Sequence, residues 1–490
     1  MVALRADSLS SVAATAPVPG YDRSRISVGI VHLGVGGFHR AHQAMYLDQL
    51  MNEGKALDWA ICGVGVLPQD RRMKEALEAQ DCLYTLVLKH PDGSLEPRVI
   101  GSIVDYLLAP DDPYRVVEKM AEPNTRIVSL TVTEGGYYLH PVTGEFDARN
   151  AAVQRDLEPG AVPATSFGLV TEALSRRRAR GLAPFTVMSC DNIQGNGHVA
   201  HRMFASFARL RDPELADWIE AEVAFPNCMV DRITPVTTDV DRTLLAERFG
   251  IEDAWPVVCE PFTQWVLQDR FGDGRPPLEE AGVQLVDDVE PYELMKLRLL
   301  NAGHQAMAYL GYLAGYRYAH EVAQDPLFAR FLRSYMDCEA SPTLRAVPGV
   351  DLEDYKTTLL ERFANPQVRD TLARLCAESS DRIPKWVLAV IREQLGADRE
   401  IERATLVVAA WARYAEGVDE QGQPITIVDR LADGLTAAAK RQRDDPTAFL
   451  AQRDLFGDLI DNDRFVATYT AALDSLHARG ARATVEQLTV

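Results

Sequence analysis

The stretch that most constrains the fold is "VGIVHLGVGGFHRAHQ", residues 28–43. Residues 28–33 are typical of a buried strand, and residues 40–51 have helical spacing. Gly34, Gly36 and Gly37 stand between them. A glycine loop between a strand and a helix lets the backbone approach a pyrophosphate at the start of the helix. The third glycine of the usual G-x-G-x-x-G motif is replaced by His39, so a tight turn without a ligand is the alternative interpretation.

The rest of the first half alternates strand-like and helix-like runs. Apolar runs at 58–66, 126–132 and 184–190 are each followed or preceded by helical stretches, and residues 82–104 predict a β-hairpin around Pro-Asp-Gly. This alternation favours a mostly parallel sheet with helices on both faces. The sequence therefore predicts an α/β, Rossmann-like first domain.

The pattern changes at "FGDGRPPLEEAG", residues 271–282, where glycines, prolines and charges indicate a boundary. Beyond Pro291 nearly every segment has helical periodicity, and a chain of 490 residues exceeds what one core usually supports. We expect a loose N-terminal leader over 1–24, a Rossmann-like NAD-binding domain over 25–285, and a predominantly α-helical substrate-binding domain over 286–490. A small-molecule site is expected in a cleft between the two domains.

Helical segments in this second domain are predicted from the same periodicity. They are expected at 292–318, 325–338, 352–364, 366–378, 400–415 and 463–479.

Composition excludes several classes of partner. The formal net charge is −20, which argues against nucleic acid and anionic membrane surfaces as partners. Seven scattered cysteines form no C-x-x-C pair, so neither a disulfide framework nor a structural zinc site is expected, which suits a cytoplasmic location. His198 and His201 lack a third ligand at useful spacing, and we interpret them as ordinary helix residues.

A polar face occurs within the apolar segment 289–307. On an ideal α-helix, Glu293, Lys296, Asn301 and His304 fall within an arc of about 140°. Burial lowers the pKa of a lysine towards the range useful for a general base. The alternative is a structural Lys–Glu pair across one turn of the helix.

Two other segments place polar residues after apolar runs. Asn192 follows the predicted strand in "TVMSCDN", and Asp231 lies in "FPNCMVDRITP". Ligands of open α/β sheets bind at the carboxyl ends of strands. Asn192 and Asn301 could donate hydrogen bonds to an oxygen that gains negative charge, although each alone is more typical of a turn or cap.

Asp70 follows the second predicted strand. A carboxylate there can accept hydrogen bonds from an adenosine ribose and repel a 2′-phosphate, which favours NAD over NADP. Its separation from the glycines exceeds the usual spacing, so a solvated loop residue is an equal alternative.

The chain resembles the polyol-specific long-chain dehydrogenases. The matching stretches include "HLGVGGFHRAHQ", "SLTVTEGGY", "FTVMSCDN", "FPNCMVDRITP", "DAWPVVCEPF" and the pattern Lys296-x4-Asn301-x2-His304, and they span almost the whole chain. The resemblance implies reversible, metal-independent, NAD-dependent oxidation of a polyol to a ketose, with D-mannitol and D-fructose as the expected pair.

The resemblance also implies roles for individual residues. Lys296 corresponds to the general acid/base, Asn192 and Asn301 to the oxyanion-binding pair, His304 to the substrate-orienting residue, and Glu293 to a proton relay. Substrate contacts are implied for Asp231, Arg374 and Arg382, the last replacing a lysine. The implied cofactor-binding residues are Gly34, Val35, Gly36, Gly37, Phe38, His39, Arg40, Asp70, Thr133 and Glu134.

Three alternatives stay open at this point. A fructuronate or tagaturonate reductase would carry the same core residues, because Arg374 and Arg382 suit a carboxylate as well as a hydroxyl. A D-arabinitol or sorbitol dehydrogenase is a further alternative, after the sugar-acid reductases. A non-catalytic nucleotide-binding protein is a third. The sequence leaves the oligomeric state open, and a monomer is compatible with it.

Overall fold

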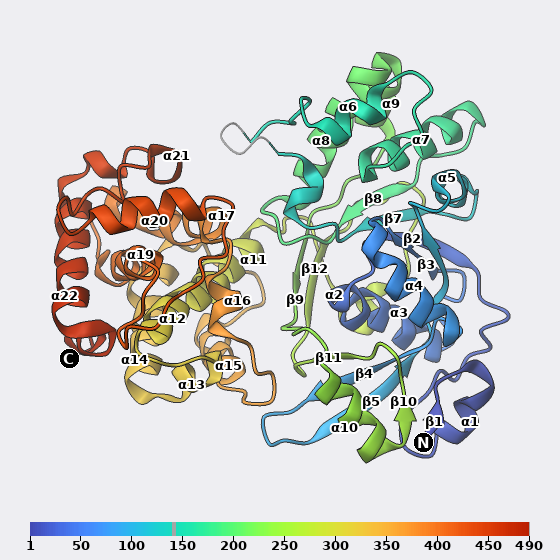
Figure 1. Cartoon of the computed structure of the whole chain (residues 1–490). Helices are drawn as coiled ribbons and strands as arrows, with labels where there is room; N and C mark the ends of the chain where they lie inside the picture. Colours follow the sequence, from blue (N-terminus) through green and yellow to red (C-terminus); the bar gives the residue numbers. More distant parts are fainter. Residues whose placement is uncertain (140–143, 490) are drawn as a thin grey trace. The chain divides into compact units, whose positions relative to one another are not determined.

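A computed structural model describes residues 1–139 and 144–489. The chain forms two compact units, residues 1–290 and 291–490. Figure 1 shows strands concentrated in the first unit and helices in the second. The predicted fold class, a Rossmann-like domain followed by a helical one, is confirmed.

The main sheet of unit 1 has five parallel strands in the order β6-β3-β2-β7-β8. Because all five are parallel, their carboxyl ends lie at one edge. The strands are β2 (Val28–Leu33), β3 (Ala60–Gly65), β6 (Ile103–Leu108), β7 (Ile127–Leu130) and β8 (Thr186–Ser189).

Helices cover both faces of this sheet, as alternation along β2 requires. Val31 and Leu33 belong to one apolar cluster with α5 to α9, whereas Ile30 belongs to another with α2 to α4. The first group is α5 (Pro113–Ala121), α6 (Ala151–Leu157), α7 (Ser166–Ala179), α8 (Asn196–Arg211) and α9 (Pro213–Glu222). The second is α2 (Gly37–Ala41), α3 (Gln43–Asn52) and α4 (Arg71–Ala79).

Three smaller sheets complete unit 1. The predicted hairpin is present as antiparallel β4 and β5, but it belongs to a separate sheet with β11. The sheet with the hairpin has the order β11 (Val257–Cys259), β4 (Tyr84–Lys89) and β5 (Leu95–Ile100). The second sheet has the order β13 (Gln284–Val286), β12 (Gln264–Gln268) and β9 (Cys228–Asp231). The third pairs β1 (Val2–Ala3) with β10 (Ile251–Glu252). The remaining helices are α1 (Leu9–Val12) and α10 (Asp239–Phe249).

The N-terminal segment is not a loose leader, and that prediction is wrong. Strand β1 pairs with β10, and Leu4, Val12 and Ala16 are buried in an apolar cluster of unit 1. The Tyr21 hydroxyl donates to Asp48 at 2.7 Å. The segment lacks a continuous apolar run, but Leu4, Val12 and Ala16, although separated in sequence, are all buried.

Unit 2 is built around the buried helix α12 (Ala302–Leu313), which packs against α13, α14, α16, α19 and α22. The helices are α11 (Glu290–Met295), α13 (Ala319–Gln324), α14 (Pro326–Tyr335), α15 (Leu352–Phe363), α16 (Leu372–Cys376), α17 (Ser379–Ile383), α18 (Ala389–Gly396), α19 (Glu402–Ala415), α20 (Ala432–Arg441), α21 (Arg453–Phe456) and α22 (Asp463–Gln487). The predicted helix at 366–378 is reduced to α16, and α17, α18 and α20 were not predicted.

Three segments of unit 2 are π-helical: η5 (Lys296–Asn301), η6 (Met336–Ala340) and η8 (Pro384–Leu388). Both η6 and η8 pack against η5. Of the seven cysteines, all free, Cys338 in η6 is the only exposed one. In the part of the chain that the structure describes, no helix combines the length and apolar character needed to cross a membrane.

Candidate active site

The glycine loop follows β2 at the carboxyl edge of the parallel sheet. Gly34 has φ +92°, and a Cβ there would lie 2.2 Å from the carbonyl oxygen of Thr131, so only glycine fits. At Gly36 the nearest atom that a Cβ would meet is the carbonyl oxygen of Gly34 at 3.9 Å, which leaves free space above the backbone. The loop therefore combines a close approach to β7 with an open surface that fits a phosphate group.

His39 and Arg40 point into the protein. Both side chains are about 1% exposed. The His39 ring stacks on His32 with centroids 3.4 Å apart, and the Arg40 guanidinium lies 5.1 Å from the Tyr84 ring centroid. The two side chains therefore face the core and not the loop surface, and cofactor binding by His39 and Arg40 stays a prediction.

Asp70 is partly buried in the turn that follows β3. Its Oδ2 accepts hydrogen bonds from the backbone N–H groups of Val66 and Leu67, both at 2.9 Å. The Asp70 carboxylate is thus bound to the backbone of its own loop and is not fully solvated. The second carboxylate oxygen is not used by these two bonds, so a ribose hydroxyl can still be accommodated by it.

Asn192 follows β8 and is exposed, whereas its neighbour Asp191 is buried. The Asp191 carboxylate accepts from the N–H of Thr133 at 2.8 Å, from the N–H of Val132 at 3.2 Å and from the Tyr137 hydroxyl at 2.7 Å. Burial raises the pKa of Asp191 to about 6. Asp191 therefore joins the loop that carries Asn192 to the loop that carries Thr133 and Glu134, a role that the sequence did not indicate.

Asp231 ends β9 and is buried, opposite Gln264 of β12. The Asn196 side-chain amide donates to the carbonyls of Asp191 and Cys228, at 3.1 and 2.8 Å. This amide ties the end of β8 to β9. Asn192 and Asp231 thus lie on two segments of unit 1 that are directly linked.

In unit 2 the predicted catalytic residues lie on one continuous segment that includes α11, η5 and α12. Glu293, Lys296, Asn301 and His304 are each between 5% and 8% exposed. The segment is π-helical from Lys296 to Asn301, so the 100° step used to place these residues does not hold there. In an α-helix residues five apart lie about 140° apart, whereas the i→i+5 bonding of a π-turn brings them close to one face.

The π-turn is supported by neighbouring side chains. The Tyr335 hydroxyl donates to the carbonyl of Arg298 at 3.2 Å, and the Arg298 guanidinium donates to the Thr343 carbonyl at 2.6 Å and pairs with Glu393. π-Turns leave backbone groups that need outside partners and are frequent at functional sites. These contacts fix the backbone between Lys296 and Asn301.

The side-chain amide nitrogen of Asn301 is the clearest indication of a ligand-binding site in this segment. Its Nδ2 is buried and has no hydrogen-bond partner among the described residues. A buried donor without a partner is costly, typically about 1–3 kcal/mol. Such a donor fits a site that binds an oxygen atom from outside the protein.

Arg374 and Arg382 are tied to each other through backbone and side-chain contacts. Arg374 in α16 forms a two-point pair with Asp370, and Nη1 of Arg382 lies 3.3 Å from the carbonyls of both Arg374 and Leu375. The Leu375 carbonyl also accepts from Gln305, the neighbour of His304 in α12, at 3.1 Å. The structure thus connects both predicted substrate contacts to the helix that carries His304.

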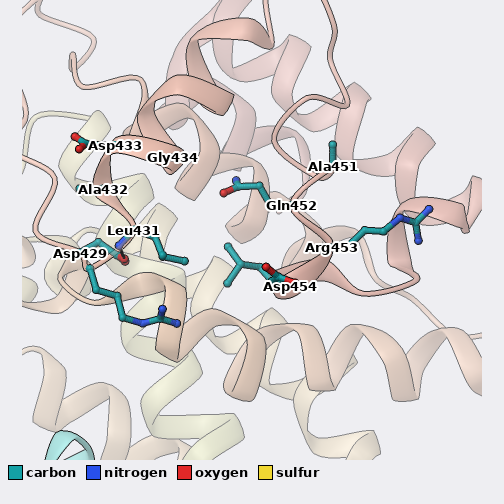
Figure 2. A pocket seen from close by; sticks show the side chains of 11 residues that line it. Asp429, Leu431, Ala432, Asp433, Gly434, Ala451, Gln452, Arg453 and Asp454 are labelled. Atoms are coloured by element: carbon teal, nitrogen blue, oxygen red, sulfur yellow. Dashed lines mark hydrogen bonds between the residues drawn. The ribbon is translucent and has the colours of Figure 1, made fainter. Parts of the chain in front are cut away.

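A pocket of about 600 Å³ lies elsewhere in unit 2, between residues 429–434 and 451–455 (Figure 2). None of the predicted site residues lines it. Its charged residues are largely engaged: Asp429 accepts from Ser380, and Arg453 pairs with Asp461. The pocket is therefore not assigned to the site.

A carboxylate cluster that the sequence did not indicate is formed by Glu339, Glu400 and Glu402. Glu339 is buried and accepts from the N–H groups of Arg403 and Ala404, both at 2.7 Å. Glu400 pairs with Arg403, and Glu402 accepts from the Ile401 N–H at 2.9 Å. These bonds satisfy the start of α19, so the cluster has a structural explanation.

Together, the parallel sheet and its glycine loop define a Rossmann-type dehydrogenase, accompanied by a helical unit with a buried polar segment. Two family models match the chain: the mannitol dehydrogenase Rossmann domain over 28–280 and the mannitol dehydrogenase C-terminal domain over 288–477. The chain belongs to the mannitol dehydrogenase family.

Curated relatives and solved structures agree with this assignment. Mannitol 2-dehydrogenase of Aspergillus fumigatus is 48% identical and covers 98% of each chain, and that of Phaeosphaeria nodorum is 50% identical over 96% of this chain and 83% of the relative. Among solved structures, Pseudomonas fluorescens mannitol 2-dehydrogenase in a ternary complex with NAD and D-mannitol has a TM-score of 0.93, with 47% identity and 99% coverage of both chains. A substrate-free D-sorbitol dehydrogenase has a TM-score of 0.89 at 39% identity, covering 99% of this chain and 100% of its own.

Proposed function

We propose that the protein is an NAD-dependent polyol dehydrogenase that interconverts D-mannitol and D-fructose, with Lys296 as general acid/base. The unpartnered, buried amide of Asn301 is the observation that carries this proposal, because an alkoxide oxygen would satisfy it. The close relation to mannitol 2-dehydrogenases supports the choice of substrate.

In the proposed reaction, unit 1 supplies the cofactor-binding residues. The backbone of residues 34–38 holds the pyrophosphate, and Asp70 holds the ribose. Bound NAD supplies the hydride acceptor. Asp191 keeps the loops of Thr133 and Asn192 in place, and Asn192 donates a hydrogen bond to the reacting oxygen.

Unit 2 supplies the proton transfer. Lys296 in its amine form takes the proton of the substrate hydroxyl, and in the reverse direction its ammonium form returns that proton to the ketose oxygen. Asn301 donates to the same oxygen, His304 orients the substrate, and Glu293 exchanges the proton with solvent. Asp231, Arg374 and Arg382 are assigned to the remaining hydroxyl groups.

The test is Lys296→Ala, with Lys440→Ala of the exposed face of α20 as the matched control. We expect turnover to fall by roughly 10²–10⁴-fold, the usual contribution of general acid–base catalysis, with NADH binding preserved. Lys440→Ala should retain wild-type turnover. Steady-state rates and NADH fluorescence titration measure both quantities.

The pH dependence distinguishes proton transfer by Lys296 from mere positioning. Polyol oxidation should rise with pH because it needs the amine, and ketose reduction should fall at high pH because it needs the ammonium form. Near-normal turnover of Lys296→Ala, or identical pH profiles in both directions, would remove Lys296 from this role.

A further inference from the structure

Arg374 already has a carboxylate partner inside the protein. Its Nε donates to Oδ1 of Asp370 at 2.6 Å, and its Nη2 donates to Oδ2 at 2.5 Å. The Asp370 side chain is 6% exposed, whereas that of Arg374 is 51% exposed. One edge of the guanidinium is thus occupied by a buried anion, and the N–H groups of Nη1 are not used by this pair.

The backbone fixes Asp370 in this position. Its carbonyl accepts from the Ala319 N–H at 2.9 Å, where α13 begins, and Tyr318 forms a β-bridge with Thr371. Thr371 then caps α16, its side chain accepting from the Arg374 N–H at 3.3 Å. Both partners of the ion pair are therefore anchored, and the pair does not depend on a flexible loop.

The charge balance of this region depends on Asp370. Arg382 lies against the Arg374 backbone, and its guanidinium lies 5.9 Å from the Trp386 ring centroid. Two guanidinium groups without a counter-ion would form a strong carboxylate site, because arginine pairs with carboxylates through two parallel hydrogen bonds. Asp370 occupies that edge of Arg374 and cancels one of the two charges.

We propose that Asp370 is a specificity-determining residue that favours neutral polyols and ketoses over sugar acids with a terminal carboxylate. The inference rests on the proposed function and extends it to substrate choice. A neutral hydroxyl accepts a hydrogen bond from the remaining N–H groups of Arg374. A substrate carboxylate at the same place would be repelled by Asp370 or would have to displace it.

The experiment compares wild type with Asp370→Asn, which preserves size and removes the charge. With NADH as reductant, kcat/KM is measured for fructose, which is neutral, and for fructuronate, which carries a terminal carboxylate. We expect the ratio of fructuronate to fructose to rise at least tenfold in the variant. Asp370→Glu, which keeps the charge, should stay close to wild type.

Asp461→Asn is the matched control, because Asp461 forms a similar two-point pair with Arg453 at 2.7 and 2.8 Å. It should leave the ratio unchanged. An unchanged ratio in a folded, fructose-active Asp370→Asn variant would overturn the inference. A wild-type enzyme that prefers fructuronate to fructose would also overturn the inference. That result would not contradict the proposed dehydrogenase chemistry. Absence of activity on both ketoses in wild type would instead contradict the proposed function.

Discussion

At the scale of single residues, the two stacked histidines beside the glycine loop, His32 and His39, make the free energy of unfolding depend on pH. The His32 ring contacts the hydroxyls of Ser129 and Thr131 at 2.8 and 2.9 Å. Burial lowers the pKa of His32 to about 3 and that of His39 well below its usual value. Both rings are therefore neutral in the folded protein at pH values where the unfolded chain binds a proton.

The sign of the effect follows from proton linkage. In the unfolded chain these two histidines bind protons as the pH falls below about 6.5, whereas in the folded protein they stay neutral. The free energy of unfolding therefore decreases on acidification. His39→Phe keeps a stacked ring and removes one such group. We expect it to reduce the acid-induced loss of unfolding free energy by about 1.4 kcal/mol per pH unit below pH 6.

Urea unfolding at several pH values between 5 and 7.5 measures this slope. His198→Phe is the control, since His198 is exposed, and it should keep the wild-type slope. A slope for His39→Phe that equals that of wild type would contradict the prediction. Neither ring nitrogen of His39 has a partner among the described residues, so the substitution itself breaks no hydrogen bond seen there.

Residue types and local order predicted part of the candidate site. The burial of Lys296, Asn301 and His304 followed from the apolar residues around them. Asp370 was missed, although its spacing of four residues from Arg374 is a recognisable signal for a helical ion pair. The hydrogen bonds of Asp191 gave no such signal, because its partners Val132, Thr133 and Tyr137 lie 59, 58 and 54 residues away in the sequence.

At the scale of elements, the π-turn η5 is the feature that sequence periodicity could not predict. Residues 296–301 are compatible with an ordinary α-helix by propensity. The partners of Arg298 within the π-turn, Tyr335, Thr343 and Glu393, are distant in sequence. In contrast, β2 was predicted with its observed bounds, because strand, glycines and helix are all encoded locally.

Deleting Leu299 tests whether the π-turn serves the reaction. Removal of one residue should convert the wide turn to α-helix, which displaces Lys296 relative to Asn301 although the flanking helices keep their faces. We expect a loss of turnover of about a hundredfold or more, since small misplacements of catalytic groups have effects of that size. Steady-state kinetics measure it, with circular dichroism to check folding.

The matched control is deletion of Glu486, an exposed residue near the C-terminal end of α22, a helix that carries none of the proposed site residues. It should keep its turnover. A folded Leu299 deletion with wild-type turnover would show that the geometry of η5 is not needed.

At the scale of the whole molecule, the chain consists of two compact units with the proposed cofactor residues in the first. A ligand that binds the folded state stabilises it by about 2.7 kcal/mol at a concentration of 100 Kd. We expect NADH to raise the unfolding transition of unit 1 more than that of unit 2.

Tryptophan variants can separate the two transitions. Trp386 and Trp411 lie in unit 2, and the other four tryptophans lie in unit 1. Calorimetry of the full chain, together with fluorescence of a chain in which Trp386 and Trp411 are replaced by Phe, measures the shift. An equal shift of both transitions, or none, would contradict cofactor binding by the first unit alone.

The exposed thiol of Cys338 has a practical consequence for future measurements. Since the other six cysteines are buried, a maleimide dye should attach at a stoichiometry near one without mutagenesis. The label would sit on η6, which packs against η5, the segment of Lys296. Its emission could therefore report, in real time and in the unmodified sequence, whether the backbone around the proposed base shifts when substrate arrives.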